Sequence, residues 1–152
     1  MLVVLIIAIA AGIVVPMMSS AGSMQVRAAM NMVAADLEYA KSMAISRGRN
    51  YSVVFNTGTE SYQLEDQAGA VIPHPVKKPD DYVIDFRNDG RLDRVDLVSA
   101  NFNGTATVTF DYLGSPFDGD GNPLNSGIVT LQAGGVTRTV TVEPVTGLIS
   151  TN

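Results

Sequence analysis

The first 18 residues constrain the fold most, because they contain no charged and no strongly polar side chain. At a rise of ~1.5 Å per residue, a helix of this length spans ~27 Å, close to the ~30 Å hydrocarbon core of a bilayer. Residues 19–22 are small enough for a signal-peptide cleavage site, but no lysine or arginine precedes the apolar run. We therefore predict that residues 1–18, from about Leu2 onward, form a membrane-spanning helix.

A helical pattern continues beyond this segment. Apolar side chains recur at alternating spacings of four and three residues, which is typical of a helix with one buried face. The members of this stripe, which we expect to pack the helix against a sheet, are Val26, Met30, Val33, Leu37, Ala40 and Ala44. Arg47 followed by Gly48 is typical of a helix end. The sequence thus predicts one helix from about Leu2 to about Arg47, whose second part, residues 19–48, is amphipathic.

Pro16 interrupts the first part of this helix. Proline donates no backbone hydrogen bond, and its ring crowds the carbonyl four residues earlier, which belongs to Gly12. We therefore expect a kink or a weak point between Gly12 and Pro16.

After Gly48 the pattern changes to that of β-strands. Strands are expected over residues 51–55, 61–64, 81–86, 105–112, 127–132 and 136–142. Gly134-Gly135 predicts a two-residue hairpin between the last two, and residues 117–126 are expected to be a loop. The predicted fold class is α+β: a long N-terminal helix packed on a C-terminal antiparallel β domain, residues 49–152.

The side-chain inventory argues against an enzyme. The chain has no cysteine and one histidine, His74, which lies between two prolines. A single histidine excludes multi-histidine metal centres and histidine dyads. No pair of carboxylates has a context that marks it as a general acid and base. We predict no catalytic residue, and interpret His74 as a loop residue with its hydrogen bonds satisfied.

The charge balance disfavours nucleic acid as a partner. The formal net charge is −5, and residues 95–152 contain a single basic side chain, Arg138. The acidic residues of this region are Asp96, Asp111, Asp118, Asp120 and Glu143. This half of the chain should repel phosphate groups.

Two acidic loops raise the hypothesis of a calcium site. Between Asp85 and Asp96 the acidic spacing is similar to that of an EF-hand loop, but Arg87 stands where an oxygen ligand belongs. Asp118, Asp120 and Asn122 offer alternating oxygens in a glycine-rich loop, and backbone carbonyls could complete the ~6–8 ligands that calcium takes. The alternative is an ordinary acidic turn at each place. No other cofactor is predicted.

Several segments resemble the type IV pilin and type II secretion pseudopilin superfamily. The apolar run of residues 2–16 resembles the helix that follows the prepilin cleavage site in that superfamily. The segments that resemble its FimT/GspH subfamily are residues 35–45 (ADLEYAKSMAI), 110–114 (FDYLG), 127–131 (GIVTL), 140–142 (VTV) and 146–147 (TG). Together these segments extend over nearly the whole chain.

This resemblance implies a structural filament subunit, a minor pseudopilin of a type II secretion system near the filament tip. The alternative is a minor pilin of a type IV pilus, with a role in adhesion, motility or DNA uptake. The implied partners are other pilin or pseudopilin subunits, an inner-membrane assembly platform and the lipid bilayer. The implied location is the bacterial inner membrane, crossed once, with the β domain in the periplasm or on an extracellular filament.

In that superfamily a leader peptide precedes the processed subunit, and the amino terminus that cleavage creates is methylated. The glutamate that pairs with a neighbouring subunit's amino terminus lies a few residues further on. The sequence begins just beyond the position where the resemblance places them. We therefore expect the complete protein to begin further upstream.

Overall fold

A computed structural model describes the backbone of residues 2–152 and the side chains of residues 21–152. Helix α1 spans Leu2–Arg47, as predicted, and its helical assignment continues past Pro16. The side chains of the predicted membrane segment, including those of Leu2, Gly12 and Pro16, lie outside the described set. Among the residues whose side chains are described, no helix is long and apolar enough to cross a membrane.

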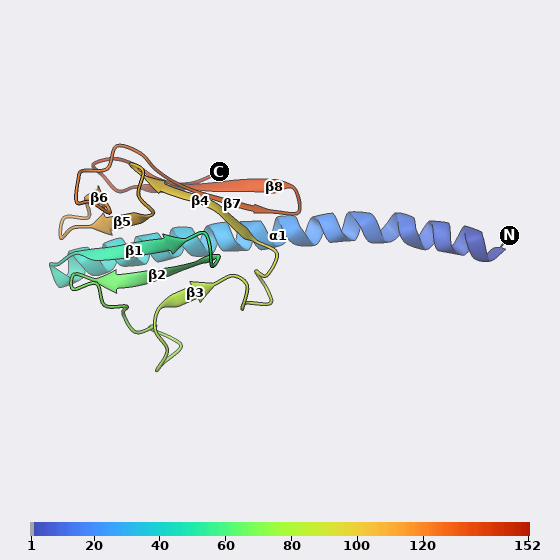
Figure 1. Ribbon diagram of the computed structural model, residues 1–152, viewed down its shortest axis with the longest axis horizontal. Helices are drawn as coiled ribbons and strands as arrows, with labels where there is room; N and C mark the ends of the chain where they lie inside the picture. Colours follow the sequence, from blue (N-terminus) through green and yellow to red (C-terminus); the bar gives the residue numbers. More distant parts are fainter. Residues whose placement is uncertain (1) are drawn as a thin grey trace.

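The rest of the described chain forms nine antiparallel strands. They are β1 (Tyr51–Asn56), β2 (Ser61–Asp66), β3 (Val83–Asp85), β4 (Asp96–Phe102), β5 (Thr107–Phe110), β6 (Pro116–Asp118), β7 (Gly127–Ala133), β8 (Val136–Val142) and β9 (Ile149–Thr151). One sheet has the strand order β3-β2-β1-β5-β6, and the other has the order β4-β7-β8-β9. Figure 1 shows both sheets lying along the C-terminal half of α1, while the N-terminal half runs beyond them.

The strands predicted from the sequence are all present, but the prediction missed three further strands. All six expected segments contain a strand, although β3 and β5 are shorter than predicted. Strands β4, β6 and β9 were not expected: β6 and β9 have three residues each, and a bulge between Leu97 and Ser99 interrupts the alternation of β4. The predicted loop of residues 117–126 is wrong at its start, because Phe117 and Asp118 pair with β5.

The predicted hairpin at Gly134-Gly135 is confirmed. Ala133 pairs with Val136 across the turn, and both glycines have positive φ angles, of 57° and 76°. Two successive left-handed residues define the type I′ turn, which suits the twist of the flanking strands.

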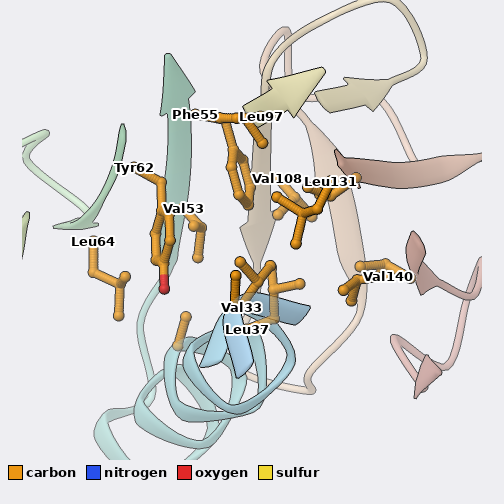
Figure 2. Packing of buried hydrophobic residues seen from close by; sticks show 14 of the residues in the cluster. Val33, Leu37, Val53, Phe55, Tyr62, Leu64, Leu97, Val108, Leu131 and Val140 are labelled. Atoms are coloured by element: carbon orange, nitrogen blue, oxygen red, sulfur yellow. The ribbon is translucent and has the colours of Figure 1, made fainter. Parts of the chain in front are cut away.

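One face of α1 forms the centre of the core. Side chains of Val26, Met30, Val33, Leu37, Ala40 and Ala44 are all buried. Figure 2 shows Val33 and Leu37 pointing from the helix toward side chains of both sheets, among them Val53, Val108, Leu131 and Val140. Because the inward residues of β1 and β7 alternate with outward ones, each sheet presents one apolar face to the helix.

We predict that Leu37→Ala lowers the free energy of unfolding by ~2–5 kcal/mol, the usual range for a large-to-small core substitution. Leu37 is fully buried, and neighbouring strands cannot follow the shortened side chain without losing other contacts. The measurement is urea unfolding of the chain produced without residues 1–20, which we expect to be a soluble monomer. Ser42→Ala, at an exposed position of the same helix, should change stability by less than ~0.5 kcal/mol. A similarly small effect of Leu37→Ala would contradict the packing described above.

Candidate assembly surface

The β domain makes a close backbone contact with the helix at Gly22. A Cβ atom at this position would lie 2.8 Å from the Cα of Gly134 and 2.9 Å from its backbone nitrogen. No side chain can be accommodated so close to another backbone, so the tip of the β7–β8 hairpin reaches the helix only because residue 22 is glycine. Figure 1 shows the tip of the β7–β8 hairpin lying beside α1.

One turn further along, Gln25 fastens a second segment to the helix. Its Oε1 accepts a hydrogen bond from the backbone N–H of Arg94 at 3.1 Å, and its Nε2 donates to Asp93 Oδ1 at 3.2 Å. We call Gly22, Gln25, Asp93, Arg94 and Gly134 the collar. The collar marks the level at which α1 leaves the β domain, and the preceding ~20 residues of helix correspond to ~30 Å of length.

A buried carboxylate links the helix to the first sheet. Asp36 lies on the buried face of α1, three residues after Val33. Its Oδ2 accepts a hydrogen bond from the Tyr62 hydroxyl at 2.7 Å, and its Oδ1 accepts one from the Tyr82 hydroxyl at 2.8 Å. Tyr62 belongs to β2, and Tyr82 immediately precedes β3. One carboxylate therefore links the helix to two neighbouring segments of the same sheet.

Aromatic stacking extends this link into the connection between β2 and β3. The ring of Tyr82 stacks on His74 with a centroid distance of 4.5 Å, and on Tyr39 of the helix with a distance of 5.6 Å. His74 Nδ1 accepts the backbone N–H groups of Val76 and Lys77, each at 3.1 Å. His74 is thus a loop histidine whose Nδ1 is satisfied by its own turn.

The environment raises the pKa values of Asp36, Tyr62 and Tyr82. Burial raises the pKa of Asp36 above its ordinary value of 3.8, although the hydrogen bonds from Tyr62 and Tyr82 and the proximity of His74 oppose the shift. Burial and the neighbouring Asp36 charge raise the pKa of Tyr62 well above its ordinary value. Burial, followed by the hydrogen bond to Asp36, raises that of Tyr82. Both tyrosines therefore remain hydrogen-bond donors over the ordinary pH range.

The comparisons with known proteins identify the class of this architecture. The sequence profile of the family described as type II transport protein GspH matches residues 29–146. The chain belongs to this GspH family. The matched region includes Asp36 and strands β1 to β8, and it ends before β9.

Solved structures share the fold. The minor pseudopilin EpsH from the type II secretion system of Vibrio cholerae superposes with a TM-score of 0.61 at 10% sequence identity, covering 84% of this chain and 96% of EpsH. The type IV minor pilin FimU of Pseudomonas aeruginosa gives a TM-score of 0.56 at 17% identity, covering 84% of this chain and 87% of FimU. No curated protein sequence matches the chain significantly.

The GspH family is described as one of type II transport proteins, and the chain shares its fold with a minor pseudopilin and a minor pilin. Sequence reasoning found the family but missed the collar and the Asp36 cluster. The sequence did contain one indication of the role of Asp36. This carboxylate lies between Val33 and Leu37, on the helix face that the apolar stripe predicts to be buried, so it requires hydrogen-bond donors there.

The loop proposed for calcium is closed by its own hydrogen bonds. Asp118 is only 3% exposed. Its Oδ1 accepts the backbone N–H groups of Asp120 at 3.0 Å and Asn122 at 2.9 Å, and its Oδ2 accepts Asn103 Nδ2 at 3.0 Å. The Asn103 amide, followed by the Asn122 N–H, lowers the pKa of Asp118. Asp120 and Asn122 are exposed, and the side-chain amide of Asn122 donates to Asp118 Oδ2 at 3.3 Å.

The other acidic loop is occupied by arginines. Arg87 pairs with Asp96 and lies 3.7 Å from Glu60, while Arg91 pairs with Asp89 at 2.8 Å. Within the part of the chain that the structure describes, no cluster of three or more histidine, cysteine or acidic side chains could hold a metal ion. The calcium hypothesis stays a prediction.

The close contact between Gly22 and Gly134 can be tested by substitution. Gly22→Leu should displace the β7–β8 hairpin from the helix, because the new side chain would overlap the backbone of Gly134. Hydrogen exchange of the Ala133 and Val136 amides should accelerate by at least about tenfold, since local opening becomes easier. Ala28→Leu, at an exposed position of α1, should leave these rates unchanged. Unchanged exchange in Gly22→Leu would show that the close approach does not hold the hairpin.

The second prediction concerns pH. Because the folded pKa of Asp36 is raised above its unfolded value, its contribution to stability is fully present below the unfolded pKa and is lost as pH rises through the folded pKa. Asp36→Asn does not titrate. The melting temperature of the wild type should therefore fall relative to that of Asp36→Asn as the pH rises from about 4.

Two controls accompany this experiment. Asp80→Asn, at an exposed position, should keep the wild-type pH profile. Asp36→Ala should destabilise at every pH, because each tyrosine hydroxyl left without an acceptor costs about 1–3 kcal/mol. Parallel pH profiles of the wild type and Asp36→Asn would contradict the raised pKa.

The third prediction separates the two interpretations of the Asp118 loop. If Asp118 only closes the loop, Asp118→Ala lowers the melting temperature equally in millimolar calcium and in chelator, whereas Asp120→Ala changes little. If calcium binds, the wild type melts at a higher temperature in calcium, and both variants lose this difference. Equal wild-type melting temperatures in the two buffers would rule out the calcium site.

Proposed function

We propose that this chain is a minor pseudopilin of a type II secretion system. The observation that carries the proposal is the match of residues 29–146 to the GspH family. The shape of the subunit supports the proposal. Its two sheets pack along the C-terminal part of a 46-residue helix, and the N-terminal part of the helix extends beyond them. A subunit of this form can hold its helix in one environment and its β domain in another.

The proposed mechanism depends on the uncharged residues 1–18. In storage this segment lies in the inner membrane, with the β domain in the periplasm. During filament growth it leaves the lipid, which requires an equally apolar destination. A bundle of similar helices from neighbouring subunits supplies such a destination. The sequence contains no glycine-rich phosphate loop, so the energy for extraction comes from an assembly platform and its ATPase.

A second candidate is a minor pilin of a type IV pilus. The similarity to FimU, at a coverage of this chain equal to that of EpsH, supports this alternative. The two candidates place the same subunit in different machines. In either machine the charge of residues 95–152 argues against a DNA-binding role for that region.

Deletion of the gene in the source bacterium tests the proposal. We expect secreted substrates of the type II system to accumulate in the periplasm while pili and twitching motility stay normal, and complementation with the gene from its natural start should restore export. In purified filaments the chain should be scarce relative to the main subunit. Normal secretion with loss of pili would overturn the proposal in favour of the pilin, and filaments built mainly of this chain would exclude a minor role in either machine.

A further inference from the structure

Five large apolar side chains are solvent-exposed at the end of the molecule where α1 terminates. They are Ile45, Tyr112, Leu113, Val145 and Leu148, which we call the distal patch. Val145 is 79% exposed and Leu113 is 69% exposed. Figure 1 shows that this end of α1, with β5 and β6 beside it, is opposite to the N-terminus.

Close contacts between two glycine turns bring the patch together. A Cβ at Gly114 would lie 2.9 Å from Ile45 Cδ1, and one at Gly147 would lie 2.6 Å from the carbonyl oxygen of Gly114. Lys41 Nζ donates a hydrogen bond to the Gly147 carbonyl at 3.0 Å. The turn that carries Leu113 and the turn that leads to Leu148 are therefore fixed to one another and to the helix.

The first of these turns is built to hold its apolar side chains outward. Asp111 Oδ1 accepts the backbone N–H groups of Leu113 at 2.9 Å and Ser115 at 2.8 Å, and the Asp111 carbonyl accepts the N–H of Gly114 at 2.9 Å. These bonds fix the backbone of Tyr112 and Leu113 while their side chains remain exposed. A rigid display of apolar groups loses little entropy on binding.

The second turn is strained. Val145 has a φ of 66°, and the N–H of Thr146 bonds to the carbonyl of Pro144 at 2.6 Å, which closes a three-residue turn around it. A β-branched residue at positive φ is a genuine outlier, and turns of this kind are rare and strained. Because the Val145 side chain is exposed, burial within its own subunit does not offset the cost of this backbone strain. Backbone strain of this kind is concentrated at functional sites, so we expect Val145 to contact another molecule.

The chemistry of the patch restricts its occupant. Four of its five residues lie in residues 112–117 and 144–152, which contain no charged side chain, whereas Ile45 lies on α1 between Lys41 and Arg47. A strongly polar partner would lose hydration over the exposed apolar side chains of the patch. The chain itself carries the matching chemistry at its other end, where residues 1–18 are uncharged and apolar.

The geometry points to the distal patch as a docking surface for the uncharged N-terminal helix of another pilin-like subunit. This inference rests on the proposed function. A contact between opposite ends of two subunits is head-to-tail, and such contacts repeat into open assemblies, whereas patch-to-patch contact would give a closed dimer. A filament subunit requires the open form.

Photo-crosslinking of the full-length protein in the source bacterium tests the inference. A photoreactive phenylalanine analogue replaces Leu113, and cross-linked peptides are identified by mass spectrometry. We expect peptides from the N-terminal helix of a pilin-like subunit. The matched control is Val98, an exposed apolar residue of the edge strand β4 outside the patch, where these peptides should be absent. Peptides from a β domain, lipid adducts, patch-to-patch dimers or no adduct would each overturn the inference.

Val145→Gly separates docking from folding. Glycine adopts the left-handed conformation without strain, so the variant should melt at the same or a higher temperature than the wild type. Loss of the side chain should nevertheless reduce the cross-link yield from position 113 by about tenfold, as expected for a residue at the centre of an interface. An unchanged yield would overturn the role of Val145 in docking.

The result can be distinguished from failure of the proposed function. If the chain belongs to neither filament machine, gene deletion leaves both secretion and pili intact. If only the docking inference fails, deletion still impairs one machine, while Leu113→Asn and Val145→Gly complement the deletion as well as the wild type.

Discussion

The packing of one helical face against two sheets at once is the interaction on which the structure depends. Val33, Leu37 and their neighbours lie between the two sheets, and the sheets also meet directly where Phe55 of β1 stacks on Phe102 of β4. Because the same helix continues beyond the β domain, the element that builds the core also carries the uncharged segment away from it. Folding and assembly therefore share a single rigid element, and a change in the helix alters both.

Hydrophobic packing alone does not fix where along the helix the domain sits, because it is non-directional. Directional contacts supply the position. Gly22 admits the hairpin tip at one level, Gln25 binds the backbone and side chain of the loop at residues 93–94, and Asp36 accepts two tyrosine hydroxyls further along. Each contact has a narrow geometry. Together they determine the length of helix that projects, which is the dimension that matters to a subunit that must reach its neighbours.

The two ends of the subunit have complementary properties. The N-terminal segment is an uncharged helix, and the opposite end presents apolar side chains on turns that are held by Asp111, Lys41 and the close approach of two glycines. Conformational strain at Val145 is concentrated on this second surface. An interface that joins unlike ends generates a filament without further symmetry. The GspH family, with relatives of the same fold in a secretion system and in a pilus, is consistent with such a subunit.

The sequence by itself determined the helix from Leu2 to Arg47, its buried stripe, the Gly134-Gly135 hairpin and the family, because these depend on local periodicity and local turn chemistry. Only the tertiary structure decided that Asp36 has two tyrosine donors, that Gly22 meets Gly134, that Asp118 closes its own loop and that the distal patch is one surface. Most of these features join residues that are distant in sequence. The Asp118 loop depends instead on which nearby groups donate hydrogen bonds to its carboxylate. A single sequence carries no record of such pairings, since they arise only when the two sheets close around the helix.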